Sequence, residues 1–497
     1  MSIYLGIDIG TQSVKALCYD TERLQLAAVS SSELEIISES GGTREQLAQW
    51  WLAAIIDCLL QIDPAIKQRI AAIGVSGQQH GFVPLAADGS VLAPVKLWCD
   101  TATVAECEQI TSNFGGEQRC IAQVGNAILP GYTAPKIRWL KNHRPDEYLR
   151  LATILLPHDY VNFYLTGERA MEYGDASGTG LLDIRTRNWH GDMLAAVDEG
   201  RDLSLCLPPL IEANACVGVV LIDVAAKLGL PPGIPVASGG GDNMMAAIGT
   251  GNVSPGHLTV SLGTSGTLFA FADSPVIDET GRLASFCSST GGWLPLLCTM
   301  NCTVSTELTR SLLQVDIDEL DGRVATVPPG ANGVMTLPFF NGERCPNLPQ
   351  GKGCILGLDD SNYTPDNLLR SAMESAVYGL RTGLDAFREQ GCEITAVRVT
   401  GGGSRSAIWR QMIADIFDLP VTVQMIDEGA ALGAALQAFW MHSKVQGKEA
   451  SLAVIIDKYL AIDSARSCTP SAEAVTAYKQ CYQHYLRHVD VVSPLYR

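Results

Sequence analysis

The sequence predicts an α/β protein built from two similar halves. The stretch "YLGIDIGTQSVKALCYD" begins at Tyr4, and a similar stretch, "LTVSLGTSGTLFAFAD", begins at Leu258, about half a chain length later. In each, two apolar strands flank a Gly-Thr turn, which is typical of a β-hairpin. A chain of 497 residues is also longer than a single core usually covers. We therefore expect two domains, formed by residues 1–249 and 250–497.

The first half shows a strand meander followed by a helix. Residues 3–30 contain three expected strands, "IYLGIDIG", "SVKALCYD" and "QLAAVSSS", and residues 44–62 have apolar positions at helical spacing. A further buried strand, "IAAIGVSG", ends in "QQHG" and places Gln79 and His80 at its carboxyl end, where side chains reach a cleft. Residues 100–230 are mixed and are expected to elaborate this half.

The segment "PGIPVASGGGDNMMAAIGTG" closes the first half with a strand, three glycines, Asp242 and a helix. One interpretation makes Asp242 an ordinary helix N-cap. The other is functional: three glycines let a ligand approach the backbone, and the helix start attracts phosphate. A carboxylate at this position can accept a proton from a hydroxyl group.

The second half repeats this order of parts. The hairpin is followed by the expected strand "GVMTLPFF", a helix over residues 366–387, and a strand, triple glycine and helix over residues 394–421. The last helix, "EGAALGAALQAFWM", is rich in alanine and glycine, which favours close packing in a core over a cofactor site.

Neither GxxxxGK[ST] nor a Rossmann GxGxxG is present, so a nucleotide would need a different kind of site. Two hairpin tips with backbone N–H groups and hydroxyls can surround a triphosphate. Asp8 aligns with Ser261, so only the first hairpin has a carboxylate that could orient Mg²⁺ through water. An acid within an apolar strand is costly to bury without a partner, which favours a functional role for Asp8.

The composition of the chain limits which classes of ligand and which location we expect. The formal net charge of -18 disfavours nucleic acid and anionic membrane surfaces, so small molecules are the expected ligands. No apolar run reaches the roughly 18 residues of a membrane span, and we expect a cytoplasmic protein. The 15 cysteines are dispersed and read as buried thiols, and Cys298 and Cys302 lack the nearby histidine of a zinc site.

Seven motifs, in order, resemble the FGGY family of carbohydrate kinases over nearly the whole chain: "GIDIGTQSVK", "GQQHG", "GYTAPKIRWLKNH", "GGGDN", "LGTSG", "GCILGLDDSNYTPDNLLRSAMES" and "TGGGSRSAIWRQM". The resemblance implies two ribonuclease-H-like (actin-like ATPase) domains around a central cleft. It also implies MgATP and a sugar as ligands. Within the family the motifs are most similar to those of members that phosphorylate D-xylulose. The oligomeric state stays open, with a homodimer as one alternative.

The resemblance also implies roles for individual residues. Asp242 would be the catalytic base and Asp8 would lie near magnesium. The residues expected at the sugar are Gln79, His80, Asp242 and Asn243. The residues expected at the phosphates are Gly10, Thr11, Gln12, Ser13, Gly263, Thr264 and Ser265. The residues expected beside the adenosine are Gly401, Gly402, Gly403 and Ser404. The secondary candidates are Lys15, Trp98, Asp100 and Glu343.

This interpretation leaves two departures from the family pattern and three alternative functions. Gln79 stands where xylulose-specific members commonly have methionine, and Ala102 where they have arginine, so another ketose or polyol is an alternative substrate. A different class is an actin-like or chaperone-like ATPase without sugar transfer. A third alternative is a sugar-binding protein that has lost catalysis, of which the sequence gives no sign.

Overall fold

The computed structural model describes residues 2–448 and 450–496. The chain divides into two compact units. Unit 1 contains Met1–Ser254, Phe271–Pro295 and Glu428–Ala461, and unit 2 contains Pro255–Ala270, Leu296–Asp427 and Ile462–Arg497. Unit 1 thus combines segments from both sides of residue 250, so the compact units are interleaved along the chain.

The main sheet of unit 1 has the strand order β14-β15-β6-β1-β2-β3, with β16 also paired to β6. Its strands are β1 (Ile3–Ile9), β2 (Ser13–Asp20), β3 (Gln25–Glu33), β6 (Ile70–Gly77), β14 (Cys216–Val219), β15 (Pro235–Ala237) and β16 (Gly240–Gly241). The first three strands are antiparallel, whereas β1 and β15 run parallel to β6. The strands expected over residues 3–30 and at 70–77 are confirmed.

Thirteen helices belong to unit 1 in the described part of the chain. They are α1 (Ala48–Leu60), α2 (Pro64–Lys67), α3 (Val104–Phe114), α4 (Glu117–Val124), α5 (Thr133–His143), α6 (Pro145–Arg150), α7 (Pro157–Thr166), α8 (Tyr173–Ala176), α9 (Gly191–Val197), α10 (Ile222–Leu228), α11 (Asp242–Gly249), α16 (Gly429–Val445) and α17 (Leu452–Tyr459). Helix α1 covers β2 and β3, as its apolar spacing predicts. Helices α3, α5 and α9 pack together around a core of their own.

Short strands and 3₁₀ turns complete unit 1. The short strands are β4 (Ile37–Ser38), β5 (Arg44–Gln46), β7 (Val83–Leu85), β8 (Val95–Lys96), β9 (Thr153–Leu155), β10 (Met171–Glu172), β11 (Leu182–Asp183), β12 (Asn188–Trp189) and β13 (Leu210–Ile211). The 3₁₀ turns are η1 (Ser177–Thr179) and η2 (Leu203–Cys206). These pieces form small two- and three-stranded sheets, and those within residues 100–230 agree with the mixed pattern expected there.

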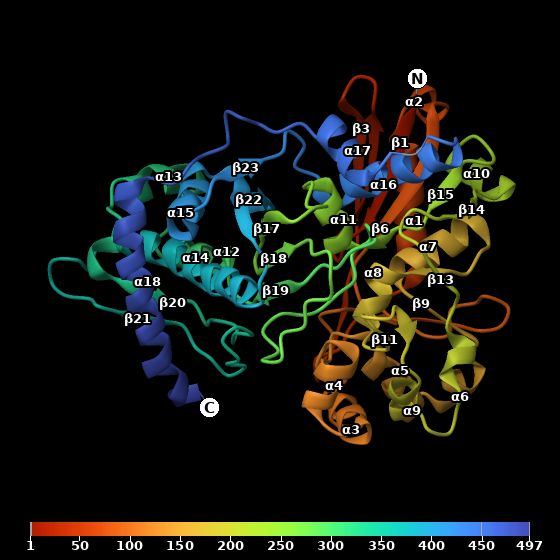
Figure 1. The fold of residues 1–497 in the computed structure, drawn as a ribbon, viewed down its shortest axis with the longest axis horizontal. Helices are drawn as coiled ribbons and strands as arrows, with labels where there is room; N and C mark the ends of the chain where they lie inside the picture. The colour runs from red at the N-terminus through yellow and green to blue at the C-terminus, as the bar shows by residue number, and fades with distance from the viewer. Residues whose placement is uncertain (1, 449, 497) are drawn as a thin grey trace. The chain divides into compact units, whose positions relative to one another are not determined.

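Helix α16 lies against β1, β6 and α11, although it follows them by some 180 residues or more in the chain (Figure 1). Small residues make this approach feasible. A Cβ atom on Gly6 would lie 1.9 Å from the carbonyl oxygen of Ala431, and one on Gly74 would lie 2.0 Å from that of Ala434. The close packing expected from the alanine and glycine content of this helix is confirmed.

The main sheet of unit 2 has the order β19-β18-β17-β22-β23. Its strands are β17 (Gly256–Leu262), β18 (Gly266–Ala270), β19 (Leu296–Thr299), β22 (Ile394–Thr400) and β23 (Val421–Val423). The remaining elements are α12 (Thr303–Leu312), α13 (Ile317–Ala325), α14 (Pro365–Glu389), α15 (Ala407–Phe417), α18 (Ala472–Val492), β20 (Met335–Leu337), β21 (Cys354–Leu356), η3 (Ala331–Gly333), η4 (Gly402–Arg405) and η5 (Ser493–Tyr496). Strand β20, expected from "GVMTLPFF", pairs only with β21 and lies outside the main sheet.

The two main sheets have the same topology. The order β3-β2-β1-β6-β15 in unit 1 corresponds to β19-β18-β17-β22-β23 in unit 2, with the same strand directions. The internal repeat is therefore confirmed. The two triple-glycine segments, however, are not equivalent: residues 239–241 follow β15, whereas residues 401–403 follow β22, the counterpart of β6. Sequence order could not reveal this, because strand adjacency is set by tertiary pairing.

Among the residues that the structure describes, no helix combines the length and the apolar character that crossing a membrane requires.

Candidate active site

Three neighbouring strands of unit 1 bring candidate residues together. Asp8 on β1 lies opposite Ser76 on β6, and Ser76 Oγ donates a 2.7 Å hydrogen bond to Asp8 Oδ1. On the other side of β6, Gly240 lies opposite Ser76, and Asp242 follows as the first residue of α11. Gly241 occupies the N-cap position, so the interpretation of Asp242 as an ordinary N-cap is wrong. The sheet thus brings two separately predicted carboxylates near each other.

The carboxyl group of Asp242 is a near-neutral proton acceptor. Burial, together with the negative charges of Asp8 and Asp175, raises its pKa to about 7, although the hydrogen bonds of its own turn act to lower it. Asp242 Oδ1 accepts hydrogen bonds from the backbone N–H of Asn243 at 2.8 Å and from Asn243 Nδ2 at 3.2 Å. A carboxylate with this pKa can take up a proton at physiological pH.

Asp8 is partly buried and lies among several charged and polar side chains. Burial raises the pKa of Asp8, while Ser76 and Lys15 lower it and Glu428 raises it. Lys15 Nζ forms a 2.5 Å ion pair with Glu428 Oε2, which leaves little of its positive charge for Asp8. The secondary candidate Lys15 therefore lies next to Asp8 across the β1–β2 hairpin, already paired.

The tip of the first hairpin is held in place by side chains from elsewhere in unit 1. Gln46 Nε2 donates to the Thr11 carbonyl oxygen at 2.8 Å, and Gln46 Oε1 accepts from Gln78 Nε2 at 2.9 Å. Trp98 Nε1 donates to Thr11 Oγ1 at 2.9 Å. The tip residues retain exposed surface: Gly10, Thr11, Gln12 and Ser13. Their accessible N–H and hydroxyl groups suit an anion.

Gln79 lies beside Asp242 through a shared neighbour. Gln79 Oε1 accepts a 2.8 Å hydrogen bond from Asn243 Nδ2, while its own Nε2 is buried without a hydrogen-bond partner among the described residues. A buried, unpaired amide donor costs about 1–3 kcal/mol, so such a group often awaits a ligand. Gln79, Asn243 and Asp242 form one polar group, as predicted for the sugar site.

His80 has an unusual backbone conformation. Its φ of 65° lies in the left-handed region, which is uncommon outside glycine. The His80 carbonyl oxygen accepts hydrogen bonds from Lys136 Nζ at 2.7 Å and from Thr133 Oγ1 at 3.2 Å. The imidazole packs on Tyr132 and Phe286, with ring centroids 4.9 and 5.6 Å away. Hydrogen bonds to its backbone and aromatic packing against its ring therefore both fix the position of His80.

The three glycines before Asp242 are required by the protein's own packing. A Cβ atom on Gly239 would lie 2.5 Å from the Val75 carbonyl oxygen, and one on Gly240 would lie 2.4 Å from Ser289 Oγ. A Cβ atom on Gly241 would lie 2.6 Å from Gln79 Cγ. Protein atoms therefore fill the side-chain direction at all three glycines, and the approach of a ligand to this backbone stays a prediction.

In unit 2, the second hairpin tip and the Gly401 turn lie next to each other. The backbone N–H groups of Cys302 and Thr303 donate to the carbonyl oxygens of Thr264 and Gly263 at 2.9 and 3.0 Å, which joins the tip to the start of α12. A Cβ atom on Gly401 would lie 2.9 Å from the backbone of Leu262, where this hairpin strand ends. The predicted residues of unit 2 thus lie in one region: Gly263, Thr264, Ser265, Gly401, Gly402, Gly403 and the buried Ser404.

Within that surface, Thr264 and Ser265 are exposed, and a Cβ atom on Gly402 would meet nothing within 4 Å. Ser404 instead turns inward, because its Oγ donates a 2.7 Å hydrogen bond to the Gly401 carbonyl oxygen. Gly402 is therefore the position of this turn with open space around it, and the hydrogen bond of Ser404 stabilises the conformation of the turn.

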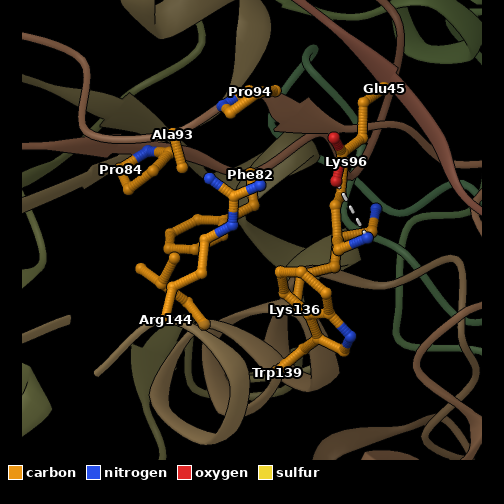
Figure 2. A pocket seen from close by; sticks show the side chains of 10 residues that line it. Glu45, Phe82, Pro84, Ala93, Pro94, Lys96, Lys136, Trp139 and Arg144 are labelled. Atoms are coloured by element: carbon orange, nitrogen blue, oxygen red, sulfur yellow. Dashed lines mark ion pairs between the residues drawn. The ribbon is translucent and has the colours of Figure 1, made fainter. Parts of the chain in front are cut away.

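A small cavity lies near the candidate sugar residues, on α5 and β8 of unit 1 (Figure 2). Lys96 Nζ in this cavity pairs with Glu45 and Asp100 at 3.0 and 3.1 Å and lies 3.9 Å from the Trp139 ring centroid. Lys136, which holds His80, also lines it. The secondary candidate Asp100 thus belongs to a buried ion-pair network.

The secondary candidate Glu343 lies in unit 2 and supports the backbone there. It accepts a 2.7 Å hydrogen bond from the N–H of Met300 and a 3.1 Å hydrogen bond from Asn301 Nδ2. Within the described residues, no group of three or more histidine, cysteine, aspartate and glutamate side chains is arranged to hold a metal ion.

Sequence reasoning missed Ser76, Lys136 and Asp175. Ser76 lies within the quoted strand before "GQQHG", and its opposition to Asp8 follows only once β1 and β6 are known to pair. Lys136 lies within the quoted motif "GYTAPKIRWLKNH", but its contact with His80 follows only from the tertiary structure, and no local pattern marks Asp175.

Comparisons with known proteins agree with these features. The N-terminal domain model of the FGGY family of carbohydrate kinases matches residues 3–249, and the C-terminal domain model matches residues 258–442. The chain is 41% identical to the xylulose kinase of Haemophilus influenzae, over 98% of this chain and 99% of that protein. It is 33% identical to the xylulose kinase of Bacillus subtilis, over 98% of this chain and 96% of that protein.

Solved structures agree as well. A xylulose kinase structure from Brucella ovis superposes with a TM-score of 0.91 at 31% identity, covering 99% of this chain and 100% of that chain. Glycerol kinase of Plasmodium falciparum with ADP superposes with a TM-score of 0.88, covering 98% of each chain, and at 19% identity this likeness concerns the fold alone. The predicted α/β fold with two ribonuclease-H-like domains of the actin-like ATPase group is confirmed.

Proposed function

Because this chain belongs to the FGGY family of carbohydrate kinases, we propose that it transfers the γ-phosphoryl group of ATP to a hydroxyl group of D-xylulose. Relatives named as xylulose kinases, at up to 41% identity over nearly the full chain, support this substrate. The single observation in the molecule that carries the proposal is the near-neutral carboxyl group of Asp242 beside the polar side chains of Gln79 and Asn243. The product is D-xylulose 5-phosphate, with ADP released.

Asp242 acts as the general base in this mechanism. Its carboxylate accepts the proton of the sugar hydroxyl as that oxygen attacks the γ-phosphorus and ADP leaves. The unpaired amide N–H of Gln79 donates to a sugar hydroxyl, and Asn243 holds both Gln79 and Asp242 in place. The ring of His80 forms a further side of the sugar site.

We propose Asp8 as the residue nearest to Mg²⁺. Magnesium prefers oxygen ligands, keeps several waters and is often held by one or two carboxylates together with substrate phosphates. The half-buried carboxylate of Asp8, with one oxygen held by Ser76, fits this pattern. Mg²⁺ would neutralise charge on the phosphates of bound ATP.

The nucleotide contacts follow the two repeated hairpins. We assign residues 1–249 the sugar, the first phosphate hairpin and the catalytic aspartate, and residues 250–497 the second phosphate hairpin and the adenosine. The exposed groups of residues 10–13, 264 and 265 support the phosphate contacts, and the open face of Gly402 supports the adenosine contact. A cytoplasmic location, where ATP is available, and a homodimer stay predictions.

A second candidate substrate is another ketose or a polyol. Ala102 offers only its backbone N–H, which donates to Asp100 Oδ1 at 3.0 Å, where an arginine would bring up to five donors. Gln79 supplies an unpaired amide donor at a different position. Gln79 and Ala102 would therefore change which sugar hydroxyl groups can be bound, whereas the proposed base Asp242 is retained.

ADP release measured by a coupled assay across ketopentoses, hexuloses and polyols tests the proposal. We expect D-xylulose to have the highest kcat/KM. Preference for another sugar would replace the substrate and keep the mechanism. ATP turnover that is equally fast without any sugar would contradict sugar phosphorylation as the activity of this chain.

The double variant Gln79→Met, Ala102→Arg tests which residues set the preference. If the native substrate is another ketose or a polyol, this variant should shift the kcat/KM ratio toward D-xylulose by at least about tenfold, because each polar contact to a hydroxyl is worth roughly 1 kcal/mol or more. The single variants are the controls. An unchanged ratio in all three would show that these two positions do not select the sugar.

A further inference from the structure

A buried charge cluster in unit 1 has entered the account so far only through the charge of Asp175, which raises the pKa of Asp242. It consists of His158 and Asp159 on α7, Glu172 at the end of β10 and Asp175 on α8. All four side chains are at most 1% exposed. His158 Nδ1 lies 2.9 Å from Asp175 Oδ2, and His158 Nε2 lies 2.9 Å from Asp159 Oδ1. Such a cluster is costly to bury, so its position calls for a reason.

We propose that Asp175, held by a positively charged His158, is a positioning residue for the sugar side of the reaction, because it sets the Gly239–Asp242 turn against the Gln79–His80 turn. The inference rests on the proposed sugar phosphorylation. It concerns residues that do not touch the substrate themselves.

Two carboxylate oxygens, each 2.9 Å from one ring nitrogen, favour a His158 imidazole that carries both ring protons. A neutral imidazole has one N–H donor and one lone pair, so one of its nitrogens would face a carboxylate oxygen at 2.9 Å with like charge on both sides. Burial lowers the pKa of His158, but Asp159 and Asp175 raise it by more, to well above its ordinary value. The cluster Asp159–His158–Asp175 therefore holds one positive and two negative charges at neutral pH.

This cluster contacts the backbone that carries the candidate site. A Cβ atom on Gly77, the last residue of β6, would lie 2.7 Å from the backbone nitrogen of His158. A Cβ atom on Gly239 would lie 2.9 Å from His158 Cδ2. His158 thus packs against the end of the strand that leads to Gln79 and against the first glycine of the turn that leads to Asp242.

Asp175 reaches further toward the site. A Cβ atom on Gly241 would lie 3.0 Å from Asp175 Oδ1 and 2.6 Å from Gln79 Cγ, so the aspartate and the glutamine meet over this glycine. The backbone of His80 lowers the pKa of Asp175 by hydrogen bonding, which places the same carboxylate at the second turn. Asp175 is therefore the one group of the cluster that faces both turns.

The remaining charged groups around this region are accounted for. Glu172 accepts hydrogen bonds from the N–H groups of Gly174 and Asp175 and from Ser289 Oγ, so it fixes the start of α8. Burial raises the pKa of Glu172 to about 7. The charge of Asp8 on β1 also acts on Asp242, and Asp8 in turn is influenced by Lys15 on β2 and by Glu428 at the start of α16. Among these groups, His158 is the cation that balances Asp175.

The test compares the isosteric variant Asp175→Asn with His158→Gln and His158→Lys in the full-length protein. Wild type is first assayed on D-xylulose and on the sugar panel, and its preferred sugar is then used throughout. Asp175→Asn should raise the KM for that sugar at least about tenfold and lower kcat, while the KM for ATP stays within about twofold, because misplaced sugar contacts cost more than intact phosphate contacts. His158→Gln should do the same. His158→Lys, which keeps the cation, should recover part of the loss.

The matched control is Asp20→Asn. Asp20 is 1% exposed, pairs with Arg69 at 2.8 Å and lies in unit 1 at the end of β2 away from Asp8. Its substitution should lower the apparent Tm without changing the ratio of the two KM values. ADP affinity measured by calorimetry confirms that each variant is folded.

Equal changes in both KM values, or an unchanged KM for the sugar in Asp175→Asn, would overturn the inference while leaving the proposed function intact. A His158→Gln variant with wild-type kinetics would overturn it as well. A wild type that phosphorylates none of the sugars would instead overturn the proposed function, and the inference with it.

Discussion

At the residue scale, the negative charges of Asp8 and Asp175 both act on the carboxyl group of Asp242. Burial and the other two negative charges raise the pKa of Asp242 to about 7. A carboxyl group with an ordinary pKa near 3.9 would be a weaker base. The charges that make Asp242 reactive also make its ionised form unfavourable, so activity and stability are opposed at this residue.

Replacement of Asp242 by asparagine should separate these two effects. Turnover should fall at least ~10²-fold, because the proton acceptor is lost. The folded pKa of about 7 lies above the unfolded value, so this group's contribution to stability is present below about pH 4 and is lost as the pH rises through 7. At pH 8 the variant should therefore have an apparent Tm higher by roughly 2–4 °C. A turnover near that of wild type would refute the assignment of the base.

The pH dependence of the wild type follows from the same group. Below pH 7 the carboxyl group of Asp242 is protonated and cannot accept the sugar proton, so kcat/KM for the sugar should fall about tenfold per pH unit as the pH is lowered below 7. The measurement is kcat/KM from pH 5.5 to 8.5 at saturating MgATP. An acidic limb that stays flat down to pH 5.5 would show that a group with a pKa near 7 is not the base.

At the scale of elements, helix α16 packs closely on the sheet and supports the turn that leads to Asp242. Gln437 on this helix accepts a 2.9 Å hydrogen bond from the N–H of Gly239 and donates a 3.0 Å hydrogen bond to its carbonyl oxygen. The helix also faces α11, which begins at Asp242. An element that is late in the chain thus holds the turn that carries the candidate base.

The substitution Gly433→Ala should loosen this contact. A Cβ atom at this position would lie 1.8 Å from the Met245 carbonyl oxygen, which belongs to the backbone of α11 and cannot rotate away. Overpacking of this kind costs about 1–3 kcal/mol or more, so we expect a lower apparent Tm and reduced kcat. Gly447→Ala is a control of a different kind, because open space surrounds that glycine but its φ is 72°. Equal stability of Gly433→Ala and wild type would contradict the packing.

For the whole molecule, the main consequence is that unit 1 is discontinuous in the chain. Residues 428–461 complete it after the chain has passed through most of unit 2. Gly6 on β1 and Gly74 on β6 face helix α16, and without this helix that face of the sheet would be exposed to solvent. Folding of unit 1 therefore needs contacts between residues that are far apart in sequence, which are slow to form.

Expression of fragments should demonstrate this dependence. A fragment of residues 1–295 should be poorly soluble or proteolysed quickly, because the face that α16 covers is exposed. The same fragment joined through a flexible linker to residues 428–461 should be more resistant to protease. If both fragments are equally stable, α16 is not required for unit 1.

The two hairpins, the candidate phosphate-binding residues at their tips and the carboxylates of Asp8 and Asp242 were predictable from the sequence. Turn chemistry and apolar periodicity are local properties, so "LGIDIGTQS" and "VSLGTSG" indicate the same hairpin wherever they occur. Only the tertiary structure decided that Gly239 to Gly241 make room for His158, Ser289 and Asp175. It also decided that the counterpart of the Gly401 turn is the end of β6 and that α16 belongs to unit 1. Each of these depends on contacts between residues distant in the chain, which no local pattern encodes.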